Sequence, residues 1–327
     1  MLVPAYQAAG TIGETLESAL SQTLPAREVI VCDDGSTDDI ASAVAPYRDR
    51  ITFLRKANGG GASALNAAAR VATGDFVAAL DADDAWARER LEALGALSTA
   101  RPDLDLLGTD AWFEAARRRI GRFNEANPFA DHDQCRAILE RCFLFHPAVR
   151  RRRLLTLGGF DESFPIAYDW ECWIRLILDG ARAGLVDQPL TSYRLRPGSL
   201  ASARPASLRD RVRVLQKVER RTDLAPELRR ALDSFVADRE RAALLAEAEH
   251  ALSVGDPRPR RRLLALARAR GASPHTRLKA LMAASSPRLA RWAVLERRPE
   301  GAMRLSRGVP HEQESRGRDG TGAGSDG

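Results

Sequence analysis

The chain has 327 residues, of which 44% are hydrophobic and 29% charged, and its formal net charge is +6. These values are typical of a globular protein with a sizeable core and exclude a fibrous or fully disordered chain. No apolar run approaches the roughly 20 residues of a spanning helix, and no signal-peptide pattern is present at the start, so a membrane-spanning or secreted protein is not expected.

The first hundred residues alternate between apolar runs of strand length and helical segments. Strands are predicted at 2–3, 28–32, 51–54 and 76–80, and helices at 11–22, 62–71 and 86–97. Strands separated by helices imply parallel crossover connections and a sheet that helices cover on both faces. The pattern therefore predicts an α/β domain with a mostly parallel sheet.

The pattern is less regular from residue 104 onward. A strand is predicted at 104–107, helices at 134–142 and 170–178, a loop at 157–162, and extended segments at 185–186 and 190–195. After residue 205 only helices rich in Ala, Leu and Arg are predicted, and the last twenty residues have the polar composition of disorder. We therefore predict a domain at 1–204, a helical region at 205–304 and a disordered tail at 305–327.

Two acidic clusters follow two of the predicted strands. Asp81 and Asp83 come after the strand at 76–80, and Asp33 and Asp34 come after the strand at 28–32. Carboxylates two residues apart point the same way and can hold a hard divalent cation, which binds ligand phosphates. Because ligands in open α/β sheets bind outside the carboxyl ends of strands, both clusters are predicted at one site. Acidic turns and helix caps are the structural alternative for each cluster.

A third carboxylate, Asp169, directly precedes the helix predicted at 170–178. N-capping of that helix is one explanation, although a capping box would have Glu or Gln where Cys172 stands. The flanking Tyr168 and Trp170 can desolvate the carboxylate and raise its pKa, as a general base at neutral pH requires. The sequence leaves both roles open.

Six short motifs, taken together and in their order, resemble those of the family 2 glycosyltransferases, whose domain has the GT-A fold. They are Val3-Pro4-Ala5-Tyr6-Gln7-Ala8, Val31-Cys32-Asp33-Asp34-Gly35-Ser36-Thr37-Asp38, Asn58-Gly59-Gly60, Ala72-Thr73-Gly74-Asp75-Phe76, Leu80-Asp81-Ala82-Asp83-Asp84 and Gly159-Phe160-Asp161-Glu162. The resemblance covers residues 2–202. It implies a Rossmann-like sheet flanked by helices, to which the helical C-terminal region is an extension.

The resemblance also implies a reaction and roles for individual residues. A sugar would pass, with inversion, from a nucleotide-sugar donor such as a UDP-sugar to a hydroxyl of a glycan, lipid-linked or small-molecule acceptor. Asp169 would be the catalytic base, and Asp81 and Asp83 would hold Mn²⁺ or Mg²⁺ at the donor diphosphate. The resemblance implies that the nucleotide sugar contacts these two acids and the following residues: Pro4, Ala5, Tyr6, Asp33, Asp34, Asn58, Ala82 and Arg196.

The chain departs from the family's pattern at three places. Tyr168 stands where an acid often precedes the base, Leu65 lies where many relatives carry Arg, and Arg196 stands where many have a metal-reaching His. An Arg can bind a phosphate but not a cation. These departures make an impaired nucleotide-sugar-binding or scaffold protein of the same fold the alternative to an active enzyme. The processive Gln-x-x-Arg-Trp signature is absent, which predicts one sugar per encounter.

Three further features bear on function and location. His146 is either a loop histidine with ordinary hydrogen bonds or an acceptor-site residue. The four cysteines lack metal-site or paired spacing, which predicts buried, reduced thiols and a cytoplasmic protein. The Arg excess after residue 204 is typical of a solvated helical surface or of peripheral contact with the inner face of the membrane. No nucleic-acid partner is expected.

Overall fold

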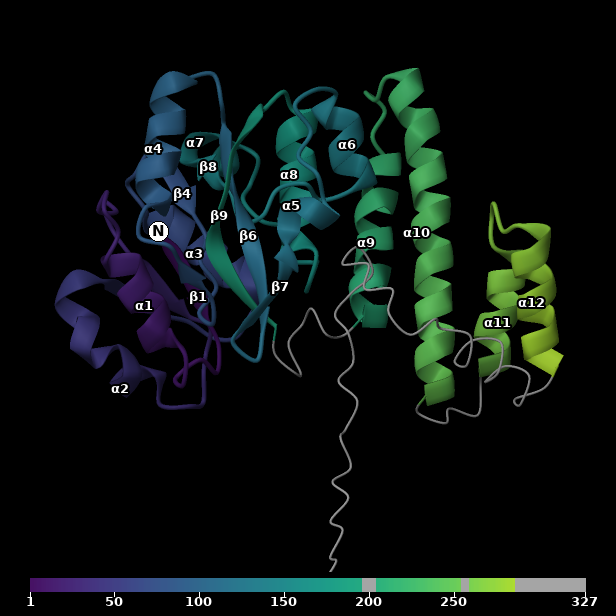
Figure 1. The fold of residues 1–327 in the computed structure, drawn as a ribbon, viewed down its shortest axis with the longest axis horizontal. Helices are drawn as coiled ribbons and strands as arrows, with labels where there is room; N and C mark the ends of the chain where they lie inside the picture. The colour runs from purple at the N-terminus through teal and green to yellow at the C-terminus, as the bar shows by residue number, and fades with distance from the viewer. Residues whose placement is uncertain (196–203, 254–258, 286–327) are drawn as a thin grey trace, which may run out of the picture.

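The computed structural model describes residues 1–195, 204–253 and 259–285, in which a sheet lies between two layers of helices and further helices follow (Figure 1). The first part of the domain has these elements: β1 (Leu2–Ala5), α1 (Ile12–Leu20), β2 (Ile30–Asp33), α2 (Ile40–Val44), the 3₁₀ helix η1 (Ala45–Arg50), β3 (Thr52–Arg55), α3 (Gly61–Val71), β4 (Phe76–Ala78), β5 (Ala85–Trp86) and α4 (Arg90–Ala100). The predicted strand–helix alternation is therefore confirmed, except that residues 85–86 form a strand and the helix begins only at Arg90.

The second part contains more strands than its sequence predicts. Its elements are β6 (Leu106–Ala115), β7 (Arg118–Arg122), α5 (Phe123–Ala126), α6 (Gln134–Glu140), β8 (Ala148–Arg150), α7 (Arg151–Thr156), α8 (Tyr168–Leu178) and β9 (Ala183–Leu195). The extended segments predicted at 185–186 and 190–195 are one strand. The hairpin between β6 and β7 turns at Ala116 and Arg117, which both have positive φ (48° and 63°). A two-residue turn with positive φ at both positions usually has the sequence Asn-Gly. Because Ala-Arg stands here instead, the sequence does not predict this hairpin.

The sheet is mixed rather than mostly parallel, which corrects one detail of the predicted α/β fold. Strands β1, β2 and β3 are parallel neighbours. A parallel bridge between Leu2 and Ala79 places the residue that follows β4 beside β1. The order continues β4-β8-β6-β9-β5, in which β6 and β9 are parallel and the other pairs antiparallel. Hairpin and return connections replace the crossovers in this half, which explains the antiparallel pairs.

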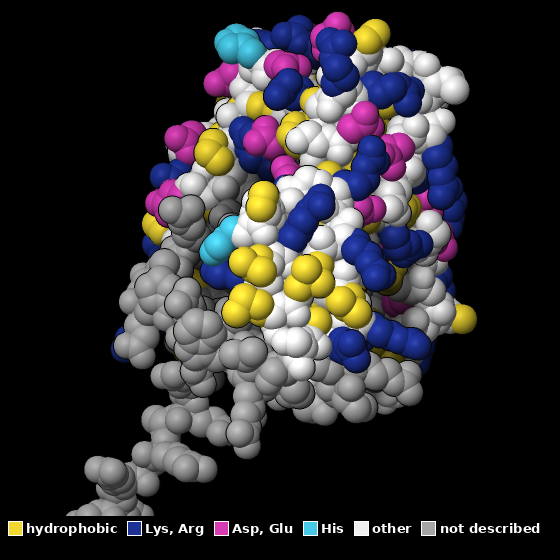
Figure 2. All heavy atoms as spheres, turned by 90° about the vertical axis from the view of Figure 1, so that its right-hand side faces the viewer, with side chains coloured by type: hydrophobic (Ala, Val, Ile, Leu, Met, Phe, Trp, Pro, Cys, Tyr) yellow, Lys and Arg dark blue, Asp and Glu magenta, His cyan; other side chains and the backbone are white. Residues whose placement is uncertain are grey.

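The C-terminal helices extend the domain on one side. They are α9 (Arg204–Glu219), α10 (Pro226–Ser253), α11 (Pro259–Arg268) and α12 (Pro274–Ser285), and the last two lie at the outer end, which faces the viewer in Figure 2. None of the helices within the described ranges has the length and apolar character that crossing a bilayer requires. Arg196 and the tail predicted at 305–327 lie outside the described residues, and the predicted domain boundaries stay predictions.

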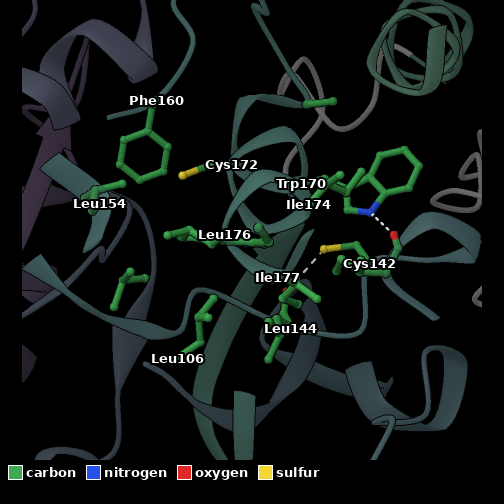
Figure 3. Close-up of a cluster of buried hydrophobic side chains, with 14 of the residues drawn as sticks. Leu106, Cys142, Leu144, Leu154, Phe160, Trp170, Cys172, Ile174, Leu176 and Ile177 are labelled. Atoms are coloured by element: carbon green, nitrogen blue, oxygen red, sulfur yellow. Dashed lines mark hydrogen bonds between the residues drawn. The ribbon is translucent and has the colours of Figure 1, made fainter. Parts of the chain in front are cut away.

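Two hydrophobic layers cover the two faces of the sheet. Alternate residues of β2 point to opposite sides, so that Ile30 belongs to the larger layer, which also contains residues of α3, α6, α8, α9 and α10, while Val31 belongs to the layer that contains residues of α1, α2 and α4. Helix α8 is the centre of the larger layer (Figure 3), where the Trp170 indole is buried and donates a hydrogen bond of 2.7 Å to the Ile138 carbonyl. All four cysteines are free, and three of them are buried.

Candidate active site

The carboxyl ends of β1, β2 and β4 lie at one edge of the sheet. Ala5 and Asp33 are opposite each other at the ends of β1 and β2, and Asp81 follows β4, which runs parallel to β1. Three loops that are far apart in the sequence therefore meet here, as the strand order predicts. Tyr6 leaves the end of β1 with 52% of its surface exposed. Pro4 and Ala5 are part of β1 itself.

Asp33 and Asp34 build the loops at this edge through their hydrogen bonds. Asp33 is fully buried; its Oδ1 accepts a bond from the Ser36 amide (2.9 Å), and its Oδ2 lies 3.3 Å from Arg55 Nε. Asp34 accepts bonds from the amides of Gly59 and Gly60 (3.0 and 2.6 Å) and from Lys56 Nζ (2.7 Å). The acidic-turn alternative is therefore realised, and contact of either acid with a nucleotide stays a prediction.

Two glycines allow these loops to approach one another. Gly35 has a φ of +76°, and a Cβ at this position would lie 2.8 Å from the Asn58 amide nitrogen. A Cβ at Gly61 would lie 2.7 Å from the Tyr168 hydroxyl. Any larger residue at either position would push the loops apart. The exposed Asn58 is thus held beside the acidic turn, and Tyr168 is held at the start of α3.

The acidic loop after β4 is fastened to α1. Thr11 and Thr15, one helical turn apart, donate hydrogen bonds to the carbonyls of Ala82 (2.7 Å) and Asp84 (2.8 Å). The Asp84 carboxylate also accepts a bond of 2.9 Å from the Arg194 amide at the end of β9. Ala82 is buried in the core, whereas Asp81 and Asp83 are partly exposed. The loop is therefore rigidly placed with its acids toward the edge of the sheet.

Asp81, Asp84 and His146 form a group with the donor atoms of a divalent-cation site. One ligand atom from each residue lies within 4.8 Å of those of the others, and His146 Nε2 is 3.8 Å from Asp81 Oδ2. Asp84 Oδ2 is buried and has no hydrogen-bond partner in the part of the chain that the structure describes. Burial raises the pKa of Asp81, and it raises that of Asp84 well above its usual range. Two carboxylates and an imidazole are suitable ligands for Mn²⁺ or Mg²⁺, whose positive charge would stabilise the ionised forms of the two carboxylates.

This group differs in part from the predicted ligand pair. Asp83 is not a member of it, although its charge raises the pKa of both Asp81 and Asp84, so its metal-ligand role stays a prediction. Asp84 belongs to the acidic motif, but the resemblance implies no role for it; its position directly after Asp83 is the one sequence signal that points to it. His146 comes from the loop before β8, and no local pattern pairs it with Asp81.

A buried arginine holds the His146 loop in place. Arg90 donates hydrogen bonds to the His146 carbonyl (2.8 Å) and to the Thr109 hydroxyl (3.1 Å), and its guanidinium lies 3.9 Å from the centre of the Trp86 ring. Burial lowers the pKa of Arg90 to about 9. His146 itself has a φ of +37°, a conformation that a non-glycine residue adopts rarely and that is typical of functional sites.

Asp169 lies near this group but does not cap its helix. Helix α8 begins at Tyr168 with Ala167 as its N-cap residue, and Asp169 Oδ1 accepts a 2.6 Å bond from the amide of Trp170. Burial raises the pKa of Asp169; the attraction of His146 opposes this rise, and the charge of Asp81 adds to it. The N-capping explanation is therefore wrong. A carboxylate with a raised pKa beside the metal-site candidates has the properties of a general base.

The departure at Leu65 has a packing explanation. Leu65 is buried in the larger hydrophobic layer, so it does not face the edge of the sheet where the acids meet. The next residue, Asn66, clamps the loop at 159–162: it donates a 2.8 Å bond to the Phe160 carbonyl and accepts one of 2.8 Å from the Phe160 amide. Glu162 accepts a further bond from Asn66 at 2.9 Å. This loop leads to α8 and so to Asp169.

Helix α9 anchors the segment that leads into α8. The carboxylate of Asp210 is buried, and it accepts hydrogen bonds from the amides of Ile166 (3.0 Å) and Ala167 (2.9 Å) at the start of α8. Lys217, about two turns further along the same face of α9, pairs with the buried Glu171 of α8 at 2.6 Å. The helical region thus positions the segment that carries Asp169.

Replacing Asp210 by Ala should lower the free energy of unfolding by about 1–2 kcal/mol, because the amides of the two residues before α8 lose their acceptor. Urea unfolding followed by circular dichroism measures this change. The matched control is Asp223→Ala, which removes an exposed acid between α9 and α10. Equal stability of the two variants would contradict this anchoring role.

Comparison with known proteins supports the predicted family and fold. Residues 1–158 match the model of the family described as glycosyl transferase family 2. A β-1,3-glucosyltransferase of Escherichia coli, WfaP, which is named as using UDP-Glc and α-D-GlcNAc-diphosphoundecaprenol, is 28% identical over 235 residues, 67% of this chain and 85% of WfaP. This chain spans a smaller share of four other similar proteins, a chondroitin synthase of Escherichia coli (26%) and three uncharacterized glycosyltransferases (57%, 58% and 62%).

Two solved structures share the fold. TarS 1–349 of S. aureus in complex with UDP-GlcNAc superposes with a TM-score of 0.63 at 22% identity, covering 89% of this chain and 88% of TarS 1–349. The mannosyltransferase PcManGT of Pyrobaculum calidifontis, in complex with GDP-Man and Mn²⁺, gives 0.55 at 23% identity, covering 91% of this chain and 87% of that one. The predicted GT-A fold is confirmed, and the resemblance of the motifs to the family 2 glycosyltransferases is confirmed over residues 1–158, the part of the chain that matches the family model.

Proposed function

We propose that this protein is a metal-dependent, inverting glycosyltransferase that transfers one sugar per encounter from a nucleotide-sugar donor to a hydroxyl of a glycan, lipid-linked or small-molecule acceptor. The observation that carries the proposal is the convergence of Asp81, Asp84 and His146 with Asp169, a carboxylate whose pKa burial raises. A cation site beside a general base is what direct displacement at an anomeric carbon requires. UDP-sugars are the first donors to test, because the names of WfaP and of the TarS complex include them.

The proposed reaction is a single displacement. Asp169 takes the proton of the acceptor hydroxyl, whose oxygen forms a bond to the anomeric carbon of the donor sugar. The bond from that carbon to the donor phosphate breaks on the opposite side, and the nucleoside diphosphate leaves with the electron pair. Mn²⁺ or Mg²⁺, when bound by Asp81, Asp84 and His146, supplies positive charge that stabilises the diphosphate. Inversion needs no second catalytic carboxylate.

The donor pocket is proposed at the same edge of the sheet. Pro4, Ala5 and the exposed Tyr6 lie at the end of β1, next to the turn that holds Asp33 and Asp34. Asn58 is exposed on the loop that Asp34 binds. These positions support the predicted nucleotide contacts. Asp83 and Ala82, in the loop after β4, are proposed to contact the nucleotide sugar as well. Contact through Arg196 stays a prediction, because that residue lies outside the described ranges.

The proposal is tested with a panel of nucleotide-sugars incubated with the protein, Mn²⁺ and no acceptor. We expect slow hydrolysis of one donor, and saturable heat when the matching nucleoside diphosphate is titrated in the presence of Mn²⁺. An impaired binding protein would give the heat without hydrolysis above that of an Asp169→Asn variant. If no member of the panel gives either signal, the proposed function is wrong.

A further inference from the structure

Helix α12 presents large apolar side chains to the solvent. Leu278, Leu281 and Met282 follow one another at helical spacing and are 59%, 50% and 47% exposed. The opposite side of the helix packs through small residues, Ala280 and Ala283, which are buried against α10 and α11. Figure 2 shows hydrophobic side chains gathered on this end of the molecule. Folding accounts for the alanines but not for the exposed larger residues, which mark an interaction surface.

The same hairpin is exclusively basic. Residues 259–285, which comprise α11 and α12, contain six Arg and one Lys but no Asp or Glu, a formal charge of +7 compared with +6 for the whole chain. Arg260, Arg261, Arg268 and Arg277 are exposed. Lys and Arg side chains border the hydrophobic cluster in Figure 2. The surface therefore combines apolar anchors with a dense positive field.

We propose that the α11–α12 hairpin docks on an anionic phospholipid surface, with Leu278, Leu281 and Met282 entering the lipid and the arginines binding the headgroup phosphates. Exposed Leu and Met beside basic residues are the composition of helices that lie in a membrane interface. Long arginine side chains can also bury their methylene groups while the guanidinium stays at the phosphates. This inference is independent of the proposed reaction.

Charge argues against the two other occupants that the chain itself could supply. Residues 286–327 contain eight Arg and six Asp or Glu, a formal charge of +2, so this segment is positive and would be repelled by the hairpin. A second copy of the hairpin would bring a second charge of +7 against the first. An anionic lipid layer instead gains from every arginine, and its acyl chains accept the three apolar side chains.

The test is flotation of the full chain with vesicles, with phosphatidylcholine alone or mixed with phosphatidylglycerol. We expect binding to the mixed vesicles that weakens as salt is raised. The triple variant Leu278→Ser, Leu281→Ser, Met282→Ser should bind at least about tenfold more weakly, because the apolar anchors are lost. Replacing Arg260, Arg261, Arg268 and Arg277 by Gln should have a similar effect and remove the salt dependence.

The matched control replaces two equally exposed apolar residues of the α/β domain, Leu24 (47%) and Val71 (48%), by Ser. This control should bind as the unaltered chain does, and the unfolding midpoints of all variants should agree, since the replaced side chains are solvent-exposed. Absence of binding to the mixed vesicles overturns the proposal, as does equal binding by the triple variant. A dimer that the triple variant converts to monomer, without vesicle binding, would show self-association instead.

Discussion

Replacing Asp169 by Asn is expected to lower turnover by at least about 10²-fold while donor binding is retained, since the amide cannot accept the acceptor proton. The variant keeps an oxygen for the 2.6 Å bond from the Trp170 amide, so the start of α8 should be unchanged. Steady-state kinetics and nucleotide titration in the presence of Mn²⁺ measure the two effects. The control is Asp179→Asn at the other end of α8, where the side chain is half-exposed.

The pH dependence of the unaltered enzyme provides a second measurement of the same residue. Burial raises the pKa of Asp169 above the ordinary 3.8. A base is active only when deprotonated, so turnover should fall as the pH drops through this raised pKa. The acidic limb should be absent from the residual activity of Asp169→Asn. Full activity in that variant would reject the assignment of the base.

The second large effect is expected from Asp84→Asn and depends on metal. Burial raises the pKa of both Asp84 and Asp81, so the fold disfavours their charged forms, and their contribution to stability is lost as the pH rises through those pKa values. At neutral pH without metal, Asp84→Asn should therefore unfold at a higher temperature than the unaltered chain. With Mn²⁺ the order should reverse, because only the unaltered site gains binding energy, about 2.7 kcal/mol at 100 times the Kd.

Thermal unfolding with Mn²⁺ or with a chelator distinguishes the candidate ligands. His146→Ala should lose the Mn²⁺ stabilisation as Asp84→Asn does, whereas Glu89→Gln, an exposed acid near the same loop, should keep it. Asp83→Ala tests the residue that the motif predicts: loss of the heat of nucleotide diphosphate binding would support its role as a ligand. If Mn²⁺ stabilises Asp84→Asn and His146→Ala as much as the unaltered chain, the proposed cation site is wrong.

The amino-acid sequence by itself determined the local elements and the order of the motifs. Apolar periodicity predicted α1, α3 and α8 to within a few residues, because burial on one helix face leaves a repeating pattern. The acidic residues after β2 and β4 were expected to meet because parallel strands end at one edge. Those expectations depend on residues close together in the chain, or on a rule of sheet topology.

Only the tertiary structure decided how distant segments complete the site. His146 reaches Asp81 from 65 positions away, through a strained backbone that the buried Arg90 holds. Asp210 of α9 accepts hydrogen bonds from the amides of the two residues before α8, and so fixes the segment that leads to Asp169. Neither contact leaves a periodic or local signal, because each depends on the packing of side chains from separate elements, and that packing is settled when the core forms.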